Sequence, residues 1–264
     1  MVKLALGLEY DGSGFYGWQV QAAVRTVQAC VEEALSKIAD HPVTVYCAGR
    51  TDTGVHARGQ VIHIETHSHR EARAWVLGTN VNLPRDISIL WARPVEDDFH
   101  ARFSAIGRSY RYFILNRPTR PGLLYPQLTW ECRHLDENSM QEAANYLVGE
   151  HDFSAYRARG CQAKNPVRTI YRLDVTRKGS IIIIEIEANA FLYHMVRNII
   201  GVLMAIGRGE ASPSWAKDVL AGGERTHGGI TAPAEGLYLT GIRYPAKYSL
   251  PQPETVLLPL WVLG

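Results

Sequence analysis

The chain has 264 residues, of which 46% are hydrophobic, and its formal net charge is only +2. This apolar content is enough for one large or two smaller hydrophobic cores, so a globular protein is expected. No stretch reaches the roughly 20 consecutive apolar residues of a membrane-spanning helix, and MVKLALGLEY at the N-terminus lacks the long apolar core of a signal peptide. The four cysteines, Cys30, Cys47, Cys132 and Cys161, form no CxxC pair, which indicates reduced thiols in a cytoplasmic protein.

The first half of the chain is predicted to follow the order β-α-β-β-α-β. Thr26 stands where it can cap the first helix. The apolar residues of that helix fall on one face: Val27, Val31, Ala34, Leu35 and Ile38. The remaining elements are expected as a helix at 70–79 and strands at 3–10, 43–48, 60–65 and 87–95.

The second half repeats this order, beginning with a long strand at about 101–115. Asp136 is expected to cap a helix that turns Met140, Ala143, Ala144 and Leu147 inward. The later elements are a hairpin of strands 166–177 and 180–188 across Lys178 and Gly179, an apolar helix at 191–208, a short helix starting at Ser212 and Pro213, and a strand at 236–244. The pattern predicts an α+β protein: two ferredoxin-like, RNA-recognition-like halves, 1–107 and 108–264, with largely antiparallel sheets flanking a central cleft.

Positive charge is concentrated in the second half. Residues 1–107 carry 10 Lys and Arg against 12 Asp and Glu, whereas residues 108–264 carry 18 against 14. Within 157–178, seven cationic side chains accompany a single acid. Such a segment can neutralise several phosphates, which favours a nucleic-acid partner, although a solvated strand face would have the same composition.

The stretch AGRTDTGVHARGQ, residues 48–60, presents one acid, Asp52, among glycines, arginines and a histidine. Asp52 can be an ordinary turn residue, or a nucleophile or base that nearby arginines keep ionised. The triplet DTG also occurs in aspartic proteases, which need two carboxylates. Because the chain has no second DTG or DSG, that interpretation would require a dimer and fits the basic surroundings poorly.

Two further segments carry candidate site residues. Tyr110 and Tyr112 share one face of a predicted strand in which arginines are interleaved, so the rings can either stack on RNA bases or belong to the core. Arg197 interrupts an apolar helix, and a buried arginine needs a partner, which an Asp in a cleft would supply.

Cys47 and three histidines are weaker candidates. Cys47 lies five residues before Asp52, but its place in a strand favours core packing over a reactive thiolate. His63, His67 and His69 resemble metal ligands superficially, but no cysteine or acid stands at a recognisable spacing, so surface or turn histidines and no metal are expected.

Five segments in order resemble the tRNA pseudouridine synthase A family over the chain to about residue 248. They are LEYDGSGFYGWQ at 8–19, AGRTDTGVHARGQV at 48–61, FHARFSAIGRSYRY at 99–112, NAFLYHMVRNIIG at 189–201 and EGLYLTGIRYP at 235–245. The resemblance implies isomerisation of uridine to pseudouridine at tRNA positions 38, 39 and 40 of the anticodon arm, without cofactor or metal. It also implies a homodimer with tRNA lying across a basic cleft that both subunits share.

The same resemblance implies roles for individual residues. Asp52 would be the catalytic carboxylate, which adds to the pyrimidine ring, attacks the sugar, or deprotonates the sugar to give a glycal. Arg50 would contact the flipped nucleotide or fill its gap, and Arg197 would pair with the carboxylate. Tyr110 would stack on the target uracil and Leu237 would form an apolar wall.

The basic segment would hold the phosphate backbone through Arg157, Arg159, Lys164 and Arg168. A non-catalytic RNA-binding protein that chaperones structured RNA is the rival hypothesis.

Overall fold

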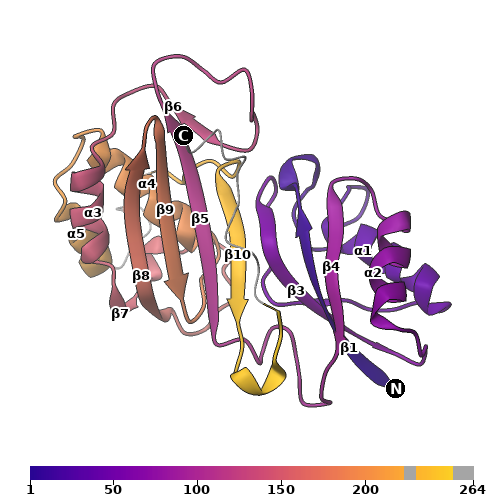
Figure 1. Ribbon diagram of the computed structural model, residues 1–264. Coiled ribbons are helices and arrows are strands. Elements are labelled where there is room, and N and C mark those ends of the chain that lie inside the picture. The colour runs from indigo at the N-terminus through magenta and orange to yellow at the C-terminus, as the bar shows by residue number, and fades with distance from the viewer. Residues whose placement is uncertain (223–229, 252–264) are drawn as a thin grey trace. The chain divides into compact units, whose positions relative to one another are not determined.

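The computed structural model describes residues 1–222 and 230–251, and within this part it is a mixed α/β protein with five α-helices and mostly antiparallel strands (Figure 1). Contacts divide the chain into two units. The first comprises Met1–Arg108 and the stretch that begins at Tyr238, and the second comprises Ser109–Leu237. Across the described residues, no helix is long and apolar enough to cross a membrane.

The first unit is built on a sheet with the strand order β4-β1-β3-β10. Strands β3 and β4 both pair with β1 antiparallel, β2 pairs with β3 antiparallel, and β10 pairs with β3 in parallel. The two helices of this unit pack against each other beside the sheet (Figure 1). The elements are β1 (Val2–Tyr10), α1 (Val27–Ala39), β2 (Tyr46–Cys47), β3 (His56–Thr66), α2 (Ala72–Asn82), β4 (Ile87–Pro94) and β10 (Leu237–Arg243).

The register of β1 and β3 explains the core of this unit. Leu4 pairs with Ile64 and Leu6 with Ile62, so alternation puts all four side chains on one face, where they are buried. Burying this apolar face is a main source of the unit's stability.

The start of α1 differs from expectation. Thr26 occupies the N-cap position, but its side chain makes no capping hydrogen bond and its buried hydroxyl has no partner in the described structure. The carbonyls of Gly17 and Trp18 serve instead, accepting from the first N–H groups of the helix at 3.2 and 3.0 Å. A preceding loop therefore satisfies the donors that a side-chain cap would otherwise satisfy.

The second unit has strands in the order β5-β9-β8-β7, with β6 parallel to β5. Asp136 caps α3 as expected, accepting from the N–H groups of Asn138 and Ser139 at 3.1 and 3.3 Å. The hairpin also forms, but its turn lies at Gly179 and Ser180, one residue later than expected. The elements are β5 (Gly107–Asn116), β6 (Thr129–Glu131), α3 (Glu137–Asn145), β7 (Gly149–Asp152), β8 (Val167–Lys178), β9 (Ile181–Ala188), α4 (Met195–Gly207) and α5 (Trp215–Gly222).

Several predicted boundaries are wrong. Of the strand expected at 43–48 only Tyr46–Cys47 forms, and the strand expected from residue 101 begins at Gly107. The apolar helix begins at Met195, after His194 in a left-handed conformation with φ of 57°. Strands β6 and β7 were not predicted, and β10 pairs with β3 of the first unit. The first unit keeps the order β-α-β-β-α-β, but two ferredoxin-like halves are not confirmed.

Candidate functional site

The loop that carries Asp52 joins β2 to β3, and backbone hydrogen bonds fix it along its length. Ala48 N–H donates to the carbonyl of Val61 at 2.8 Å, and Gln60 Nε2 donates to the carbonyl of Gly49 at 2.6 Å. Trp18 N–H donates to the carbonyl of Thr51 at 3.0 Å, and Val55 N–H donates to the carbonyl of Asp52 at 3.1 Å. The carboxylate therefore stands on a backbone held on both sides.

Exposure differs sharply between neighbours in this loop. Thr51 is buried and shares a 2.8 Å hydrogen bond with the hydroxyl of Tyr10, whereas Asp52 is half-buried and Arg50 is exposed. Gly17 lies against the loop with φ of 85°, and a Cβ there would come within 2.8 Å of the Thr51 carbonyl oxygen. Only glycine fits both the conformation and the space, which keeps the Asp52 backbone in place.

His56, the first residue of β3, packs beside the Asp52 loop, and the sequence did not predict its structural contacts. Its side chain is buried, its Nδ1 accepts a hydrogen bond from Gly12 N–H at 3.0 Å, and its ring stacks on Tyr238 with centroids 4.5 Å apart. A hint lay in the sequence spacing, because His56 follows Asp52 by four residues.

The structure describes the surroundings of five other residues on β2, on β3 and just after β3. Burial raises the pKa of the Cys47 thiol to about 12, which disfavours a thiolate nucleophile. Arg58 donates to Glu9 at 2.6 Å across two strands. His67 and His69 are exposed as expected, but His63 is buried within β3, so its assignment to the surface or a turn was wrong.

The second unit separates the two tyrosines of β5. Tyr112 is fully buried, and its hydroxyl bonds to Thr129 Oγ1 at 2.6 Å and donates to the carbonyl of Pro233 at 2.9 Å. Tyr110 remains partly exposed, with its ring edge-on to Phe191 at 5.2 Å. Tyr112 is thus a core residue, and Tyr110 alone of the pair can reach a ligand.

Arg197 projects from α4 next to the segment that leads into β10. Its Nε donates to the carbonyl of Ala232 at 2.8 Å, and Ala232 N–H donates back to the carbonyl of Arg197 at 3.0 Å. Gly201 lets this segment approach, because a Cβ there would lie 1.8 Å from the Ile230 carbonyl oxygen. Leu237, at the start of β10, is 4% exposed.

The basic segment is only partly available to a ligand. Arg159 and Lys164 are exposed, Arg157 is half-buried, and burial lowers the pKa of Arg168. The side chains further along β8 are engaged within the protein: Arg172 pairs with Asp174 and Glu185, and Arg177 pairs with Glu137.

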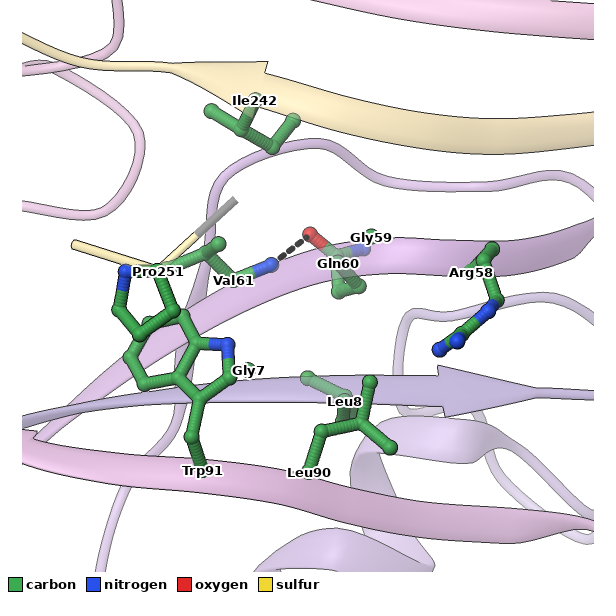
Figure 2. A pocket seen from close by; sticks show the side chains of 10 residues that line it. All are labelled: Gly7, Leu8, Arg58, Gly59, Gln60, Val61, Leu90, Trp91, Ile242 and Pro251. Atoms are coloured by element: carbon green, nitrogen blue, oxygen red, sulfur yellow. Dashed lines mark hydrogen bonds between the residues drawn. The ribbon is translucent and has the colours of Figure 1, made fainter. Parts of the chain in front are cut away.

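A separate pocket of about 280 Å³ lies on the sheet of the first unit (Figure 2). Trp91 lies across Gly7, where a Cβ would come within 2.1 Å of the indole Nε1. Among the residues that the structure describes, Arg58 is the one charged side chain that lines the pocket, and it is the arginine paired with Glu9. None of the predicted site residues lines this pocket, which is therefore distinct from the Asp52 loop. Its lining residues are Gly7, Leu8, Arg58, Gly59, Gln60, Val61, Leu90, Trp91, Ile242 and Pro251.

Comparison with known proteins gives the class. A family model described as tRNA pseudouridine synthase matches residues 8–104 and 143–245, so the chain belongs to this family. The protein is an enzyme of the isomerase class, and the reaction of its family is the isomerisation of uridine to pseudouridine in tRNA. Asp52, Arg50, Arg197 and Leu237 lie inside the matched residues, and Tyr110 lies outside them.

Individual relatives narrow the class to tRNA pseudouridine synthase A. A protein of that name from Alcanivorax borkumensis is 55% identical over 263 residues, covering 99% of this chain and 98% of the relative. Another from Nitrosococcus oceani is 57% identical over 251 residues, covering 95% and 97%. A crystal structure of an archaeal box H/ACA sRNP Nop10–Cbf5 complex aligns with 76% of this chain and 43% of that chain at a TM-score of 0.35 and 12% identity, too low to support an argument.

Proposed function

We propose that this enzyme converts uridine to pseudouridine at positions 38, 39 and 40 of the tRNA anticodon arm, with Asp52 as its catalytic carboxylate. The observation that carries the proposal is a half-buried carboxylate on a loop whose backbone is hydrogen-bonded on both sides. Such a fixed backbone holds a reacting group in place, which is the positioning that catalysis needs.

The reaction exchanges one bond to the sugar for another. The bond from ribose C1′ to base N1 breaks, the base turns, and C1′ bonds to C5. The hydrogen on C5 leaves as a proton and N1 takes up a proton, so no atom or electron is gained overall. A carboxylate suffices as nucleophile or base for this exchange.

The other predicted residues divide the remaining work. The target base must leave its stack at a cost of a few kcal/mol, and Arg50 would contact the flipped nucleotide or fill its gap. Tyr110 would stack on the uracil and Leu237 would wall the pocket. Arg197 would pair with the Asp52 carboxylate and hold its rotamer.

The proposal extends to the assembly and to the architecture. A homodimer would hold tRNA across a basic cleft in the cytoplasm, with Arg157, Arg159, Lys164 and Arg168 on the phosphate backbone. We also propose that each of the two halves has a ferredoxin-like, RNA-recognition-like architecture. The order β-α-β-β-α-β in the first unit supports this.

Asp52→Asn tests the catalytic role. With tRNA labelled by tritium at C5 of uridine, the wild type should release tritium, and the variant should lose at least about a thousandfold in rate because an amide is neither a nucleophile nor a base here. Asp40→Asn is the matched control, since Asp40 is exposed with φ of 60°, a conformation that Asn adopts readily.

Substrates with a single uridine at position 38, 39 or 40 would test the site preference. Equal rates for Asp52→Asn and the control would refute the catalytic assignment. A wild type that binds tRNA but forms no pseudouridine would favour the RNA-chaperone hypothesis.

A further inference from the structure

A cluster of aromatic rings lies exposed beside the Asp52 loop, and the reaction proposed above does not use it. Tyr46 on β2 is 47% exposed and Phe103 is 75% exposed. His63 and His100 connect them: Tyr46 stacks on His63 at 4.9 Å, His63 meets His100 edge-on at 4.6 Å, and His100 lies 4.3 Å from Phe103. The four rings form one continuous group that ends in solvent.

The turn that carries Phe103 is fixed to the sheet. Nδ1 of His63 accepts from Ala101 N–H at 3.1 Å, and the hydroxyl of Tyr244 donates to the carbonyl of Ala101 at 2.6 Å. Nδ1 of His100 accepts from the N–H groups of Arg102 and Phe103 at 3.1 and 3.3 Å. Phe103 is therefore held in solvent by an ordered backbone, and its contact with His100 makes it part of a contiguous group of rings rather than a single exposed side chain.

Cationic side chains border the rings. The Arg102 guanidinium lies 5.5 Å from the centre of the Phe103 ring. Arg50 and Arg102 both lie close enough to Cys47 to lower the pKa of its thiol against the larger effect of burial. Arg108 ties the two segments together, donating to the carbonyls of Ala48 at 3.3 Å and Arg102 at 2.8 Å.

The acidic side chains that the structure describes close to these rings include two that are paired with lysines. Glu65 pairs with Lys3 at 3.2 Å, and Asp98, whose partner Tyr248 also bonds to Ser104, pairs with Lys247. The surface defined by Tyr46, Arg102 and Phe103 thus combines two exposed rings with an arginine for which no ion pair is found among the described residues, next to the Asp52 loop.

We propose that Tyr46, Arg102 and Phe103 form a contact surface for the RNA strand adjacent to the target uridine. The inference rests on the proposed function, because it takes the Asp52 loop as the place where the target nucleotide is held. Exposed rings accept the face of an unstacked base or a sugar, and Arg102 pairs with a phosphate. This mixture of rings and cations is typical of surfaces that bind single-stranded nucleic acid, and it fits a polyanion better than a second copy of a chain whose net charge is +2.

The test uses the full chain and an unmodified tRNA transcript, with the dissociation constant measured across a salt series. Phe103→Ala should weaken binding about tenfold, as expected for loss of one base stack. Arg102→Gln should reduce the slope of log K against log salt by about 0.8, the equivalent of one phosphate contact. In turnover, KM should rise more than kcat falls, and Phe103→Tyr should restore affinity.

Two exposed residues of α2 provide matched controls. Val81→Ala removes an exposed apolar side chain and Arg73→Gln removes an exposed cation, and both should bind tRNA as the wild type does. Since Phe103 and Arg102 are exposed, their variants should also melt at the wild-type temperature.

Three outcomes separate the alternatives. If the wild type is active and both variants bind like their controls, the proposed surface is wrong. If Phe103→Ala changes the molecular mass in solution but not the tRNA affinity, the surface is an interface between copies and the RNA proposal is overturned. If the wild type forms no pseudouridine but Phe103→Ala still binds tRNA more weakly, the reaction proposal fails while the RNA surface stands.

Discussion

Tyr110 and Tyr112 show how far two identical residues on one strand face can differ in role. Alternation correctly puts both on the same face of β5. It does not say which ring is covered, because Tyr112 is covered by a segment 121 positions further along the chain, where Pro233 accepts its hydroxyl hydrogen. Gly236 allows that approach, since a Cβ there would lie 3.0 Å from Tyr112 Cζ. The local sequence therefore does not determine which tyrosine is buried, because burial depends on a segment far away along the chain.

This difference predicts opposite phenotypes for the two tyrosines. Tyr110→Ala should reduce kcat/KM for tRNA by roughly tenfold to a hundredfold through loss of a base stack, whereas Tyr110→Phe should keep most activity. Tyr112→Phe should instead lower the free energy of unfolding by about 1–2 kcal/mol, because Thr129 and Pro233 lose a buried hydrogen-bond partner. Steady-state kinetics and urea unfolding measure the two effects. Wild-type kinetics in Tyr110→Ala would remove Tyr110 from the site.

For the candidate site residues, the sequence indicates which side chains to test but not which groups surround them. Asp52 and Arg50 stand out locally because one acid lies among glycines and arginines, and the family resemblance then assigned their roles. The hydrogen bond from Trp18 N–H to the Thr51 carbonyl and the close approach of Gly17 to this loop were not predictable, because both residues are far from Asp52 in sequence. The same holds for Arg197, whose partner Ala232 lies on a different segment.

At the scale of elements, the sequence predicted long segments with a clear apolar period. It did not predict short strands, or segments whose backbone bonds to distant side chains. Strand β1 and helices α1 and α3 follow clear apolar periods. Residues 101–106 have strand-like composition but form a turn, because His63 and His100 accept the N–H groups that a strand would give to a neighbour. Strands β6 and β7, of three and four residues, are too short to show a period.

The His63 contact makes the stability of this turn depend on pH. Burial, with smaller effects from His100 and Lys3, lowers the pKa of His63 to about 4, while Glu65 acts in the opposite direction. Tyr46 and Phe99 cover the ring with aromatic faces and edges. Because the pKa is near 6.5 in the unfolded chain, the unfolded chain takes up a proton first on acidification. The stabilisation is complete above about pH 6.5 and is lost as the pH falls towards 4.

We therefore expect the free energy of unfolding to fall by about 2 kcal/mol from pH 7 to pH 5 on account of His63 alone. In His63→Asn, whose amide oxygen can still accept from Ala101 N–H, the decrease over this range should be smaller by that amount. Urea unfolding of both proteins at the two pH values measures the difference. Equal decreases would mean that His63 is not the group responsible.

At the scale of the whole molecule, net charge is a poor guide to where a polyanion binds. The chain carries only +2, yet cations and acids are unevenly distributed, and two of the seven cations in the basic segment already pair with acids. Arg172 pairs with Asp174 on β8 itself and with Glu185 on β9, and Arg177 pairs with Glu137 on α3. Counting charges in the sequence overestimates the number of cations that can bind phosphate, because the pairing of strands determines which arginines form ion pairs with acids.

The exposed pair Arg159 and Lys164 should carry the salt-dependent share of tRNA binding in this segment, because neither has an ion pair among the described residues. The double charge reversal Arg159→Glu with Lys164→Glu should weaken binding at low salt by at least tenfold and reduce the slope of log K against log salt by about 1.5, since two phosphate contacts are lost. The same net change at Arg73 and Lys217, both exposed on helices, controls for long-range charge. An equal loss in this control would assign the effect to overall charge. Arg172→Glu should instead lower stability, because it removes the cation that pairs with Asp174 and one of the two arginines, Arg111 and Arg172, that pair with Glu185. A salt slope unchanged by the first reversal would make the segment an ordinary solvated face, with tRNA held elsewhere on the protein.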